Sequence, residues 1–220
     1  MDAPGVSREL LFKNLHELDL LNRTLGGHAV TLQGIKKLMT DKGKTYHIAD
    51  IGCGSGDTMR YIARWARLNG YKIKLTGIDM NTDAIDYLVQ MSHDYAEING
   101  IASDYRNFIH TNSTFDIVHC SLFCHHLKDA EISALFTWFK QKNIGFVIND
   151  LQRNWLAYYC ALIFTRILNG SALAKNDGPI SVLRGFKRRE LKSFLQTADI
   201  KNYSIERKRG FRWLVVGTVT

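Results

Sequence analysis

The spacing of hydrophobic residues changes along the chain from a helical period to short strand-like runs. Near the amino end, leucines recur three or four positions apart until Gly26 and Gly27, and the same spacing resumes after this pair. The apolar residues concerned are Leu10, Leu11, Leu15, Leu18, Leu21, Leu32, Ile35 and Leu38. The first 44 residues therefore predict a helix, a turn and a second helix.

From residue 45 onward, apolar runs of strand length alternate with amphipathic segments of helical length. Strands are predicted over residues 46–52, 72–79, 97–105, 115–123 and 144–151. Helices are predicted over residues 56–70, 81–96 and 131–141. This alternation predicts an α/β fold with a mostly parallel, doubly wound sheet and helices on both of its faces.

The regular alternation is interrupted after residue 151. An aromatic, apolar helix begins near Trp155, and a glycine-containing loop with a turn at 177–179 is predicted to follow it. A helix over 187–198 and two strands over 200–208 and 212–219 are predicted to complete the chain. We expect one domain with four parts: an N-terminal helical lid (1–44), a core (45–150), a helical insertion (151–187) that adds to the lid, and a C-terminal helix with a β-hairpin (188–220).

Composition narrows the classes of protein. The 220 residues carry a net charge of +8, much of it in the runs GFKRRELK (185–192) and ERKRGFR (206–212). We interpret these runs as a solvated basic face, because no RNA-binding module surrounds them and nucleic acid is therefore not the expected partner. No apolar run reaches the roughly 18 residues of a membrane span, and the start lacks the order of a secretory signal. A cytoplasmic protein is expected.

The four cysteines predict no metal site. They are Cys53, Cys120, Cys124 and Cys160. Cys120 and Cys124 lie close together in sequence, but no second pair at zinc-binding spacing accompanies them. Reduced, partly buried thiols are therefore expected.

The sequence IADIGCGSGD (48–57) sets three glycines at alternate positions between a predicted strand and a predicted helix. It lacks the lysine of a triphosphate-binding loop, G-x-x-x-x-G-K-S/T. It also departs from the dinucleotide pattern G-x-G-x-x-G, because its third glycine comes one residue early. Asp50 and Asp57 flank the glycines, and their carboxylates would repel a pyrophosphate but pair with a cationic amino group.

Asp79 ends the next predicted strand. A carboxylate in that place can accept hydrogen bonds from both hydroxyls of a ribose. The ligand implied by the loop and this acid together is an adenosine that lacks phosphates and carries an ammonium group. S-adenosylmethionine fits this description.

On these residues the sequence resembles the class I S-adenosylmethionine-dependent methyltransferases. The resemblance rests on IADIGCGSGD (48–57), GIDMNTDAI (77–85), SDY (103–105) and FDIVHCSLFCHHL (115–127), and it extends over about residues 46–150. It implies a Rossmann-like, seven-stranded, mostly parallel sheet with an antiparallel last strand. It also implies an enzyme whose cofactor is S-adenosylmethionine, bound by the core, with S-adenosylhomocysteine as product.

The resemblance assigns a role to individual residues of the core. The residues expected to bind the cofactor are Asp50, Gly52, Cys53, Gly54, Gly56, Asp79, Met80, Asp104, Tyr105 and Cys120. The loop residues and Asp50 would border the methionine part, Asp79 the ribose and Met80 the adenine face. Asp104 would bind the adenine amino group beside Tyr105, although an ordinary turn aspartate is the alternative. Cys120 would lie beneath the methionine part.

Two adjacent histidines, His125 and His126, follow the fourth predicted strand, whose carboxyl end faces the cofactor cleft. A hydroxyl acceptor must lose a proton during methyl transfer, and histidine is the usual base near neutral pH. One of the two is therefore a candidate catalytic base. A packing or capping role is the alternative for both.

The acceptor is expected in the same cleft, beside the end of the fifth strand. Asn149, Asp150 and Arg153 would rim the cleft, with Arg153 either steering a polar acceptor or paired with Asp150. Trp155 and Arg184 complete the candidate acceptor-binding residues. The almost wholly apolar segment 155–168 would cover an apolar ligand, with extra core or a homodimer surface as alternatives.

The predicted function is S-adenosylmethionine-dependent methylation of a small, largely apolar aromatic or polyketide-type acceptor, at a hydroxyl oxygen. Methylation of a carbon in a quinone-type ring is the nearest alternative, since the same histidine could deprotonate either acceptor. An RNA methyltransferase and a cofactor-binding partner of a synthase complex without turnover are two further alternatives. The first is motivated by the net charge of +8.

Overall fold

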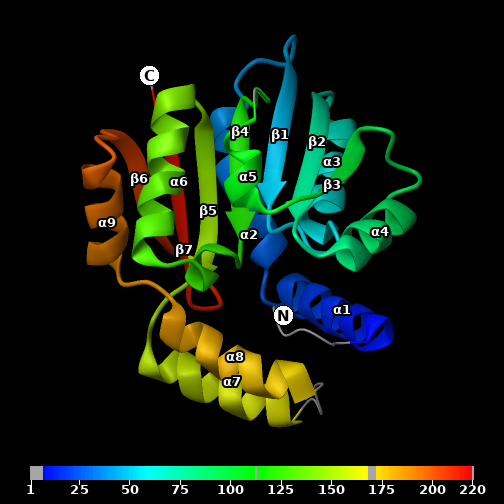
Figure 1. The fold of residues 1–220 in the computed structure, drawn as a ribbon, viewed down its shortest axis with the longest axis vertical. Helices are drawn as coiled ribbons and strands as arrows, with labels where there is room; N and C mark the ends of the chain where they lie inside the picture. Colours follow the sequence, from blue (N-terminus) through cyan, green and yellow to red (C-terminus); the bar gives the residue numbers. More distant parts are fainter. Residues whose placement is uncertain (1–6, 112, 168–171, 220) are drawn as a thin grey trace.

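A computed structural model describes residues 7–111, 113–167 and 172–219. Its centre is one seven-stranded sheet with strand order β3-β2-β1-β4-β5-β7-β6 (Figure 1). The strands are β1 (Thr45–Ile51), β2 (Lys72–Asp79), β3 (Ile98–Ala102), β4 (Ile117–Ser121), β5 (Gly145–Leu151), β6 (Asn202–Lys208) and β7 (Arg212–Thr218). β1 to β5 pair in parallel, and β7 runs antiparallel to both of its neighbours. The predicted doubly wound sheet with an antiparallel last strand is confirmed.

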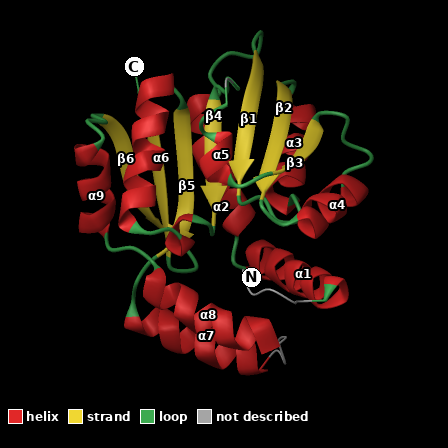
Figure 2. Ribbon diagram, viewed as in Figure 1, coloured by secondary structure: helices red, strands yellow, loops and turns green. Residues whose placement is uncertain are grey.

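Helices cover both faces of this sheet (Figure 2). They are α1 (Arg8–Thr24), α2 (Gly27–Leu38), α3 (Asp57–Asn69), α4 (Thr82–Met91), α5 (Tyr105–Phe108), α6 (Asp129–Lys142), α7 (Trp155–Ile167), α8 (Ala172–Arg184) and α9 (Arg188–Thr197), with a 3₁₀ turn η1 (Cys124–His126). Side-chain caps explain where several of them begin. Ser7 accepts the N–H of Leu10, and Asn81 accepts the N–H of Ala84. Within the described residues, none of these helices has both the length and the apolar content needed to span a bilayer.

Two details of the predicted elements are wrong. β3 ends at Ala102, before the predicted limit of 105, because the side chain of Asp104 accepts the N–H of Arg106 and starts α5. The turn predicted at 177–179 is absent, and these residues continue α8 with Pro179 inside the helix. α8 packs along α7, and such tertiary packing can outweigh the turn preference of an Asp-Gly-Pro sequence.

The core consists of two apolar layers, one on each face of the sheet. In one layer, the Phe139 ring of α6 stacks on Phe146 of β5 with 5.0 Å between the ring centroids. In the other layer, Ile35 of α2 and Ile62 of α3 are fully buried against the sheet. The sheet is therefore a rigid support for the loops at its carboxyl edge.

Three helices lie beyond the carboxyl ends of the parallel strands: α1, α7 and α8 (Figure 1). α8 contacts α1, β5 and η1, so the α7–α8 hairpin borders the same edge as the glycine loop. α2 instead packs against β4, β5 and β7 as part of the core. Within the described part of the segment expected to form an N-terminal lid (1–44), α1 lies at this edge and α2 belongs to the core.

A glycine in α2 sets how closely this helix approaches the sheet. A Cβ added at Gly34 would lie 2.5 Å from Cγ1 of Val147 on β5, and valine has little rotamer freedom to move away. Gly34→Ala should therefore lower the free energy of unfolding by about 1–3 kcal/mol through overpacking. Urea unfolding followed by circular dichroism measures this loss.

Gln33→Ala is the matched control, because Gln33 is exposed on the same helix. Its change in stability should stay within about 0.5 kcal/mol. Equal stability of Gly34→Ala and the unmodified protein would contradict the close helix–sheet contact.

Candidate functional site

The loop between β1 and α3 has a backbone that strongly favours glycine. Gly52, Gly54 and Gly56 have φ angles of +73°, +53° and +73°, which side-chain-bearing residues rarely adopt. A Cβ at Gly52 would lie 2.3 Å from the ring of Phe123, and one at Gly54 would lie 3.3 Å from Cδ2 of Leu15. The loop is therefore enclosed between Phe123, which follows β4, and helix α1. The sequence alone indicated neither neighbour.

Asp79 at the end of β2 is bound to this loop. Its Oδ2 accepts the N–H of Gly54 at 3.0 Å, and its Oδ1 accepts the N–H of Asn81 at 3.0 Å. Each oxygen of an ionised carboxylate can accept more than one hydrogen bond, so ribose hydroxyls could donate to the same group. Met80, the next residue, is 65% exposed and presents an apolar side chain beside the carboxylate.

Asp50 lies in the interior at the end of β1. It is 2% exposed, and its ion-pair contact among the described residues is with Nδ1 of His119, 3.3 Å from its Oδ1. Burial lowers the pKa of His119 to about 3, so this imidazole is neutral and does not balance the carboxylate. Burial, followed by the charges of Asp79 and Asp57, raises the pKa of Asp50 well above its ordinary value.

The second flanking acid, Asp57, is neutralised within the protein. Its side chain forms an ion pair with Arg60 and accepts a hydrogen bond from the hydroxyl of Ser55. Of the two carboxylates predicted to face a cation, only Asp50 is thus left without a cationic partner in the described part of the chain.

Asp104 is used locally, as the alternative interpretation expected. It caps α5 and forms an ion pair with Arg106, and this hydrogen bond to Arg106 lowers the pKa of Asp104. The neighbouring Tyr105 packs edge-to-face on Phe123, with 5.4 Å between the centroids. The Tyr105 hydroxyl is buried without a hydrogen-bond partner among the described residues, and burial raises its pKa to about 12. Such an unsatisfied donor is typical of a site that a polar ligand completes.

The two candidate cysteines of the core differ in burial. Cys53 of the loop is half-buried, and Cys120 of β4 is fully buried. The Cys120 thiol contacts that of Cys124, which raises the pKa of Cys124. In the described part of the chain, no group of three or more histidine, cysteine, aspartate or glutamate side chains could hold a metal ion.

The adjacent histidines have different surroundings. His125 is 5% exposed, and its Nδ1 lies 2.7 Å from Oδ1 of Asp150, while its backbone N–H donates to Oδ2 of the same carboxylate at 3.2 Å. Burial alone would raise the pKa of Asp150, but the contacts with His125 and the N–H of Leu151 lower it. His126 is exposed and its ring centroid lies 4.1 Å from that of His125.

The predicted acceptor residues are not brought together. Asn149 is fully buried, where its Nδ2 donates to the carbonyl of Gly27 and to Oγ1 of Thr31, both at 2.9 Å. Its position is inside the packing of α2, not on a cleft rim. Trp155 is 73% exposed at the start of α7.

The two arginines predicted to bind the acceptor, Arg153 and Arg184, lie on different elements and do not contact Asn149 or Asp150 in the described ion pairs and hydrogen bonds. Arg184 is exposed at the end of α8. Arg153 pairs with Glu190 of α9, so the expected alternative of an Arg153–Asp150 pair is wrong.

Sequence reasoning missed a buried arginine beside this edge. Arg212 at the start of β7 is 2% exposed, and burial lowers its pKa to about 10. Its Nη2 donates to Oδ1 of Asn22 at 2.7 Å, and its Nη1 lies 3.4 Å from Oδ1 of Asn149. Arg212 therefore fixes the α1–α2 turn to the sheet, a role hidden in the sequence because it ends a run of basic residues.

The loop and its acids fit a cationic adenosine compound. A buried carboxylate without a cationic partner among the described residues, a second carboxylate at the end of the next strand and a loop whose three glycines have positive φ angles favour a ligand with an ammonium group and a ribose. A pyrophosphate in the same place would face both carboxylates. S-adenosylmethionine would be held here by the glycine loop, Asp50 and Asp79.

The comparisons with known proteins agree with this assignment. Residues 48–141 match the family model described as a methyltransferase domain. A SAM-dependent methyltransferase from Aquifex aeolicus is similar in structure, with 15% identity, a TM-score of 0.67, and coverage of 98% of this chain and 100% of that chain. The plantazolicin methyltransferase BpumL in complex with SAH has 15% identity, a TM-score of 0.68 and coverage of 96% and 93%. No curated protein is similar enough in sequence to count as a relative.

A third similar structure is the CurJ carbon methyltransferase, with 12% identity, a TM-score of 0.68 and coverage of 98% of this chain and 61% of that chain. At such identities the likeness shows a shared fold. The family model matches residues 48–141, which include the glycine loop, β2 and β4. The chain therefore contains a class I S-adenosylmethionine-dependent methyltransferase domain, and S-adenosylmethionine is its cofactor.

Proposed function

We propose that this methyltransferase acts on a small, largely apolar aromatic or polyketide-type acceptor and methylates a hydroxyl oxygen. One observation carries the proposal, the buried pair of His125 and Asp150 with Nδ1 and Oδ1 2.7 Å apart. The pair follows β4 and ends β5, at the same sheet edge as the glycine loop after β1. Ligands of open α/β sheets bind outside this edge, so the pair borders the acceptor.

Asp150 prepares His125 to accept a proton. The lowered pKa of Asp150 keeps its carboxylate ionised, and an ionised carboxylate can only accept hydrogen bonds. His125 must then donate from Nδ1, which leaves the lone pair on Nε2 to take a proton from the acceptor hydroxyl. S-adenosylmethionine supplies an electrophilic methyl group, so the protein has to orient the acceptor, exclude water and remove this proton.

The surface of the α7–α8 hairpin supports an apolar acceptor. Large apolar side chains are exposed on both helices: Trp155, Leu156, Tyr159, Ile163, Ile180 and Leu183. α8 contacts η1, the turn that carries His125, so the hairpin lies beside the proposed base. A homodimer would cover the same side chains, and the oligomeric state in solution distinguishes the two uses.

Similar structures support a small-molecule acceptor, but they differ in the atom that is methylated. BpumL was solved with a monoazolic desmethylPZN analog and SAH, and CurJ is a carbon methyltransferase. A histidine base serves both kinds of acceptor, because an activated ring carbon also has to lose a proton. Methylation of a carbon therefore remains the second candidate.

A panel of phenols and hydroxyquinones with S-adenosylmethionine tests the proposed reaction. Mass spectrometry of the products should locate the new methyl group on oxygen. A methyl group on carbon would replace the proposal by its second candidate. Cofactor binding without product from any acceptor would favour a partner protein without turnover.

Replacing His125 tests the proposed base. His125→Ala should lower kcat by about 10²–10⁴-fold, because proton removal is lost, while cofactor affinity stays unchanged. Asp150→Asn should lower kcat as well and alter its pH profile, because an amide can stabilise the other imidazole tautomer. Steady-state kinetics and calorimetry with S-adenosylhomocysteine measure both quantities, with circular dichroism to check folding.

His126→Ala is the matched comparison, because His126 is the adjacent, exposed ring. It should retain most of the turnover. A larger loss in His126→Ala than in His125→Ala would contradict the choice of base.

The cofactor residues are tested by two substitutions, both of which should weaken binding and one of which should also change stability. Asp79→Ala should weaken S-adenosylhomocysteine binding by about 1–3 kcal/mol, because charge-assisted hydrogen bonds are lost. Asp50→Asn should weaken binding too, yet stabilise the ligand-free protein at pH 8 by about 1–3 kcal/mol. Calorimetry and urea unfolding measure the two effects.

The stabilisation by Asp50→Asn should depend on pH. The pKa of Asp50 is higher in the folded than in the unfolded protein, so ionisation destabilises the fold once the pH exceeds the unfolded value of 3.8. The gain should therefore shrink as the pH falls towards 4. Asp94→Asn is the control, because its side chain is 78% exposed. Equal unfolding curves of Asp50→Asn and the unmodified protein at pH 8 would contradict a buried, unbalanced carboxylate.

A further inference from the structure

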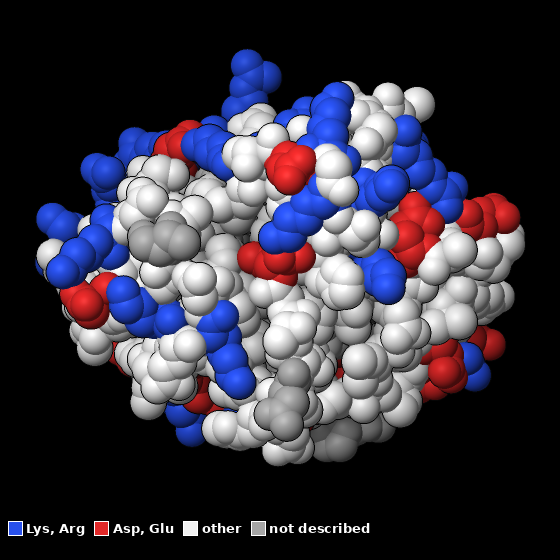
Figure 3. Space-filling view, turned by 90° about the horizontal axis from the view of Figure 1, so that it is seen from above, with Lys and Arg blue, Asp and Glu red and all other residues white. Residues whose placement is uncertain are grey.

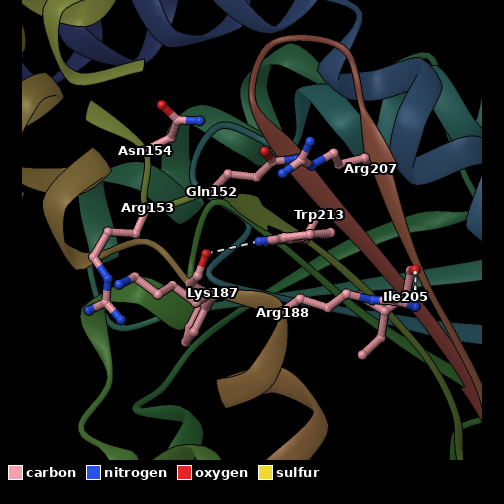
Figure 4. A pocket seen from close by; sticks show the side chains of 9 residues that line it. Gln152, Arg153, Asn154, Lys187, Arg188, Ile205, Arg207 and Trp213 are labelled. Atoms are coloured by element: carbon pink, nitrogen blue, oxygen red, sulfur yellow. Dashed lines mark hydrogen bonds between the residues drawn. The ribbon is translucent and has the colours of Figure 1, made fainter. Parts of the chain in front are cut away.

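A cavity of about 550 Å³ opens at the carboxyl edge of the sheet, away from the glycine loop. It lies between the start of α9 and the β6–β7 hairpin, beside residues 152–154 that follow β5 (Figure 4). β4 and β5 separate this cavity from the glycine loop at the ends of β1 and β2. None of the residues assigned above to the cofactor or the base lines it, so it is a separate site.

The two basic runs of the sequence meet in this cavity. Lys187 and Arg188 come from the first run and Arg207 from the second, and Arg153 adds a fourth cation. Figure 4 shows Arg207 on the hairpin side and Lys187 with Arg153 on the opposite side, with Trp213 between them. No carboxylate is among the lining residues. Among these four cations, Arg153 forms an ion pair with an acid, Glu190 of α9.

Two of the remaining cations, Arg188 and Arg207, contact groups that are not acids. Nη2 of Arg188 lies 3.5 Å from the carbonyl of Ile205, and the Arg207 guanidinium lies 5.8 Å from the ring centroid of Trp213. Both contacts fix a side chain without neutralising its charge. Three positive charges therefore surround one concave site, and each is exposed enough to reach a ligand.

The floor of the cavity is apolar and rigid. Trp213 and Phe186 are buried, and Nε1 of Trp213 donates to the carbonyl of Phe186 at 2.9 Å. Gln152 is buried beside them, with its Nε2 donating to the carbonyl of Arg212 at 2.7 Å. An aromatic floor below several cations suits a ligand with an apolar body and an anionic group.

We propose that this cavity binds a small organic anion through its phosphate or carboxylate group. The volume exceeds that of an inorganic ion and falls within the range of about 300–1,000 Å³ typical of small-molecule sites. Guanidinium groups bind both oxyanions, because their N–H groups match two oxygens at once. The proposal does not depend on the methyl acceptor. Of the candidate acceptor-binding residues, Arg153 alone lines this cavity, where it pairs with Glu190 and is not one of the three cations that carry the proposal.

The face at the opposite end of the sheet from this cavity carries charges of both signs. On the face seen from above in Figure 3, where the parallel strands begin, Lys and Arg side chains lie scattered with Asp and Glu between them. A nucleic-acid surface would need a continuous basic tract, whereas these three cations are gathered around one cavity.

The indole N–H of Trp213 provides a direct readout. The protein contains four tryptophans, so a ¹⁵N-labelled sample gives four indole signals, and Trp213→Phe assigns the one in the cavity. Phenyl phosphate and benzoate are the two anionic probes, with benzamide as the neutral comparison. Titration should shift the Trp213 signal with either or both anions and leave it unmoved by benzamide. The better of the two anions identifies the preferred group.

Substitutions then locate the binding site. Lys187→Ala and Arg207→Ala should each weaken binding of the preferred anion by at least about fivefold, because a charge-assisted contact is lost. Arg189→Ala is the matched control, because Arg189 is exposed on the same helix as Arg188 but does not line the cavity. Its affinity should change less than twofold. All three side chains are exposed, so folding should be retained.

Three outcomes would overturn the proposal. These are no shift of the Trp213 signal at 10 mM of either anion (about 3 kcal/mol of binding at most), equal shifts with benzamide, and equal weakening by Arg189→Ala. If neither anion binds but RNA does, and RNA binding depends on Lys187 and Arg207, these residues belong to a nucleic-acid surface and the proposal is overturned. Failure of the methyltransferase assays leaves all of these results unchanged, so the two proposals are tested separately.

Discussion

The hydrogen bond from the N–H of Gly54 to Oδ2 of Asp79 joins the ends of β1 and β2, and the cofactor site depends on it. It fixes the position of a carboxylate relative to a loop whose glycines have positive φ angles. Because β1 and β2 are neighbours in the sheet, their register sets the distance that this bond has to span. The loop is held from outside by Phe123 and Leu15, so parts distant in sequence stabilise one short segment.

The carboxyl edge of the sheet has opposite charge at its two ends. At β1 and β2 the charged side chains are acids: Asp50 is buried with a described ion-pair contact to a neutral histidine, and Asp79 binds the glycine loop. Towards β6 and β7 the side chains at the edge are cationic, with Lys187, Arg188 and Arg207 around an aromatic floor. The net charge of +8 is therefore unevenly distributed, and each end suits a ligand of the opposite sign.

The sequence predicted what depends on local patterns. Alternating strand and helix periods predicted the sheet, and the glycine spacing with Asp79 predicted the loop that the structure contains. The sequence did not predict contacts between segments that are distant along the chain. Asn149 appeared to be a cleft residue, but its amide is used by Gly27 and Thr31 of α2, more than 115 positions away.

Neighbours in sequence can also differ in ways that no pattern reveals. His125 and His126 are chemically identical, yet the turn of η1 directs one ring towards Asp150 and leaves the other exposed. The two basic runs are interpreted as a solvated face when read one after the other. In the folded protein the β6–β7 hairpin lies beside the start of α9, so Arg207 and Lys187 line the same cavity.

Two buried aspartates at this edge show how one environment supports two kinds of chemistry. Asp50 and Asp150 are both almost inaccessible, and the loss of hydration alone would raise the pKa of each. Asp150 overcomes this effect because His125 and two backbone N–H groups contact its carboxylate, whereas Asp50 faces a neutral imidazole and the charge of Asp79. The pKa values of the two groups are thereby shifted in opposite directions, a separation that commonly marks different roles in one site. A carboxylate that is unstable until a cation arrives suits the binding of a positively charged cofactor, and one that is already satisfied suits the orientation of a base.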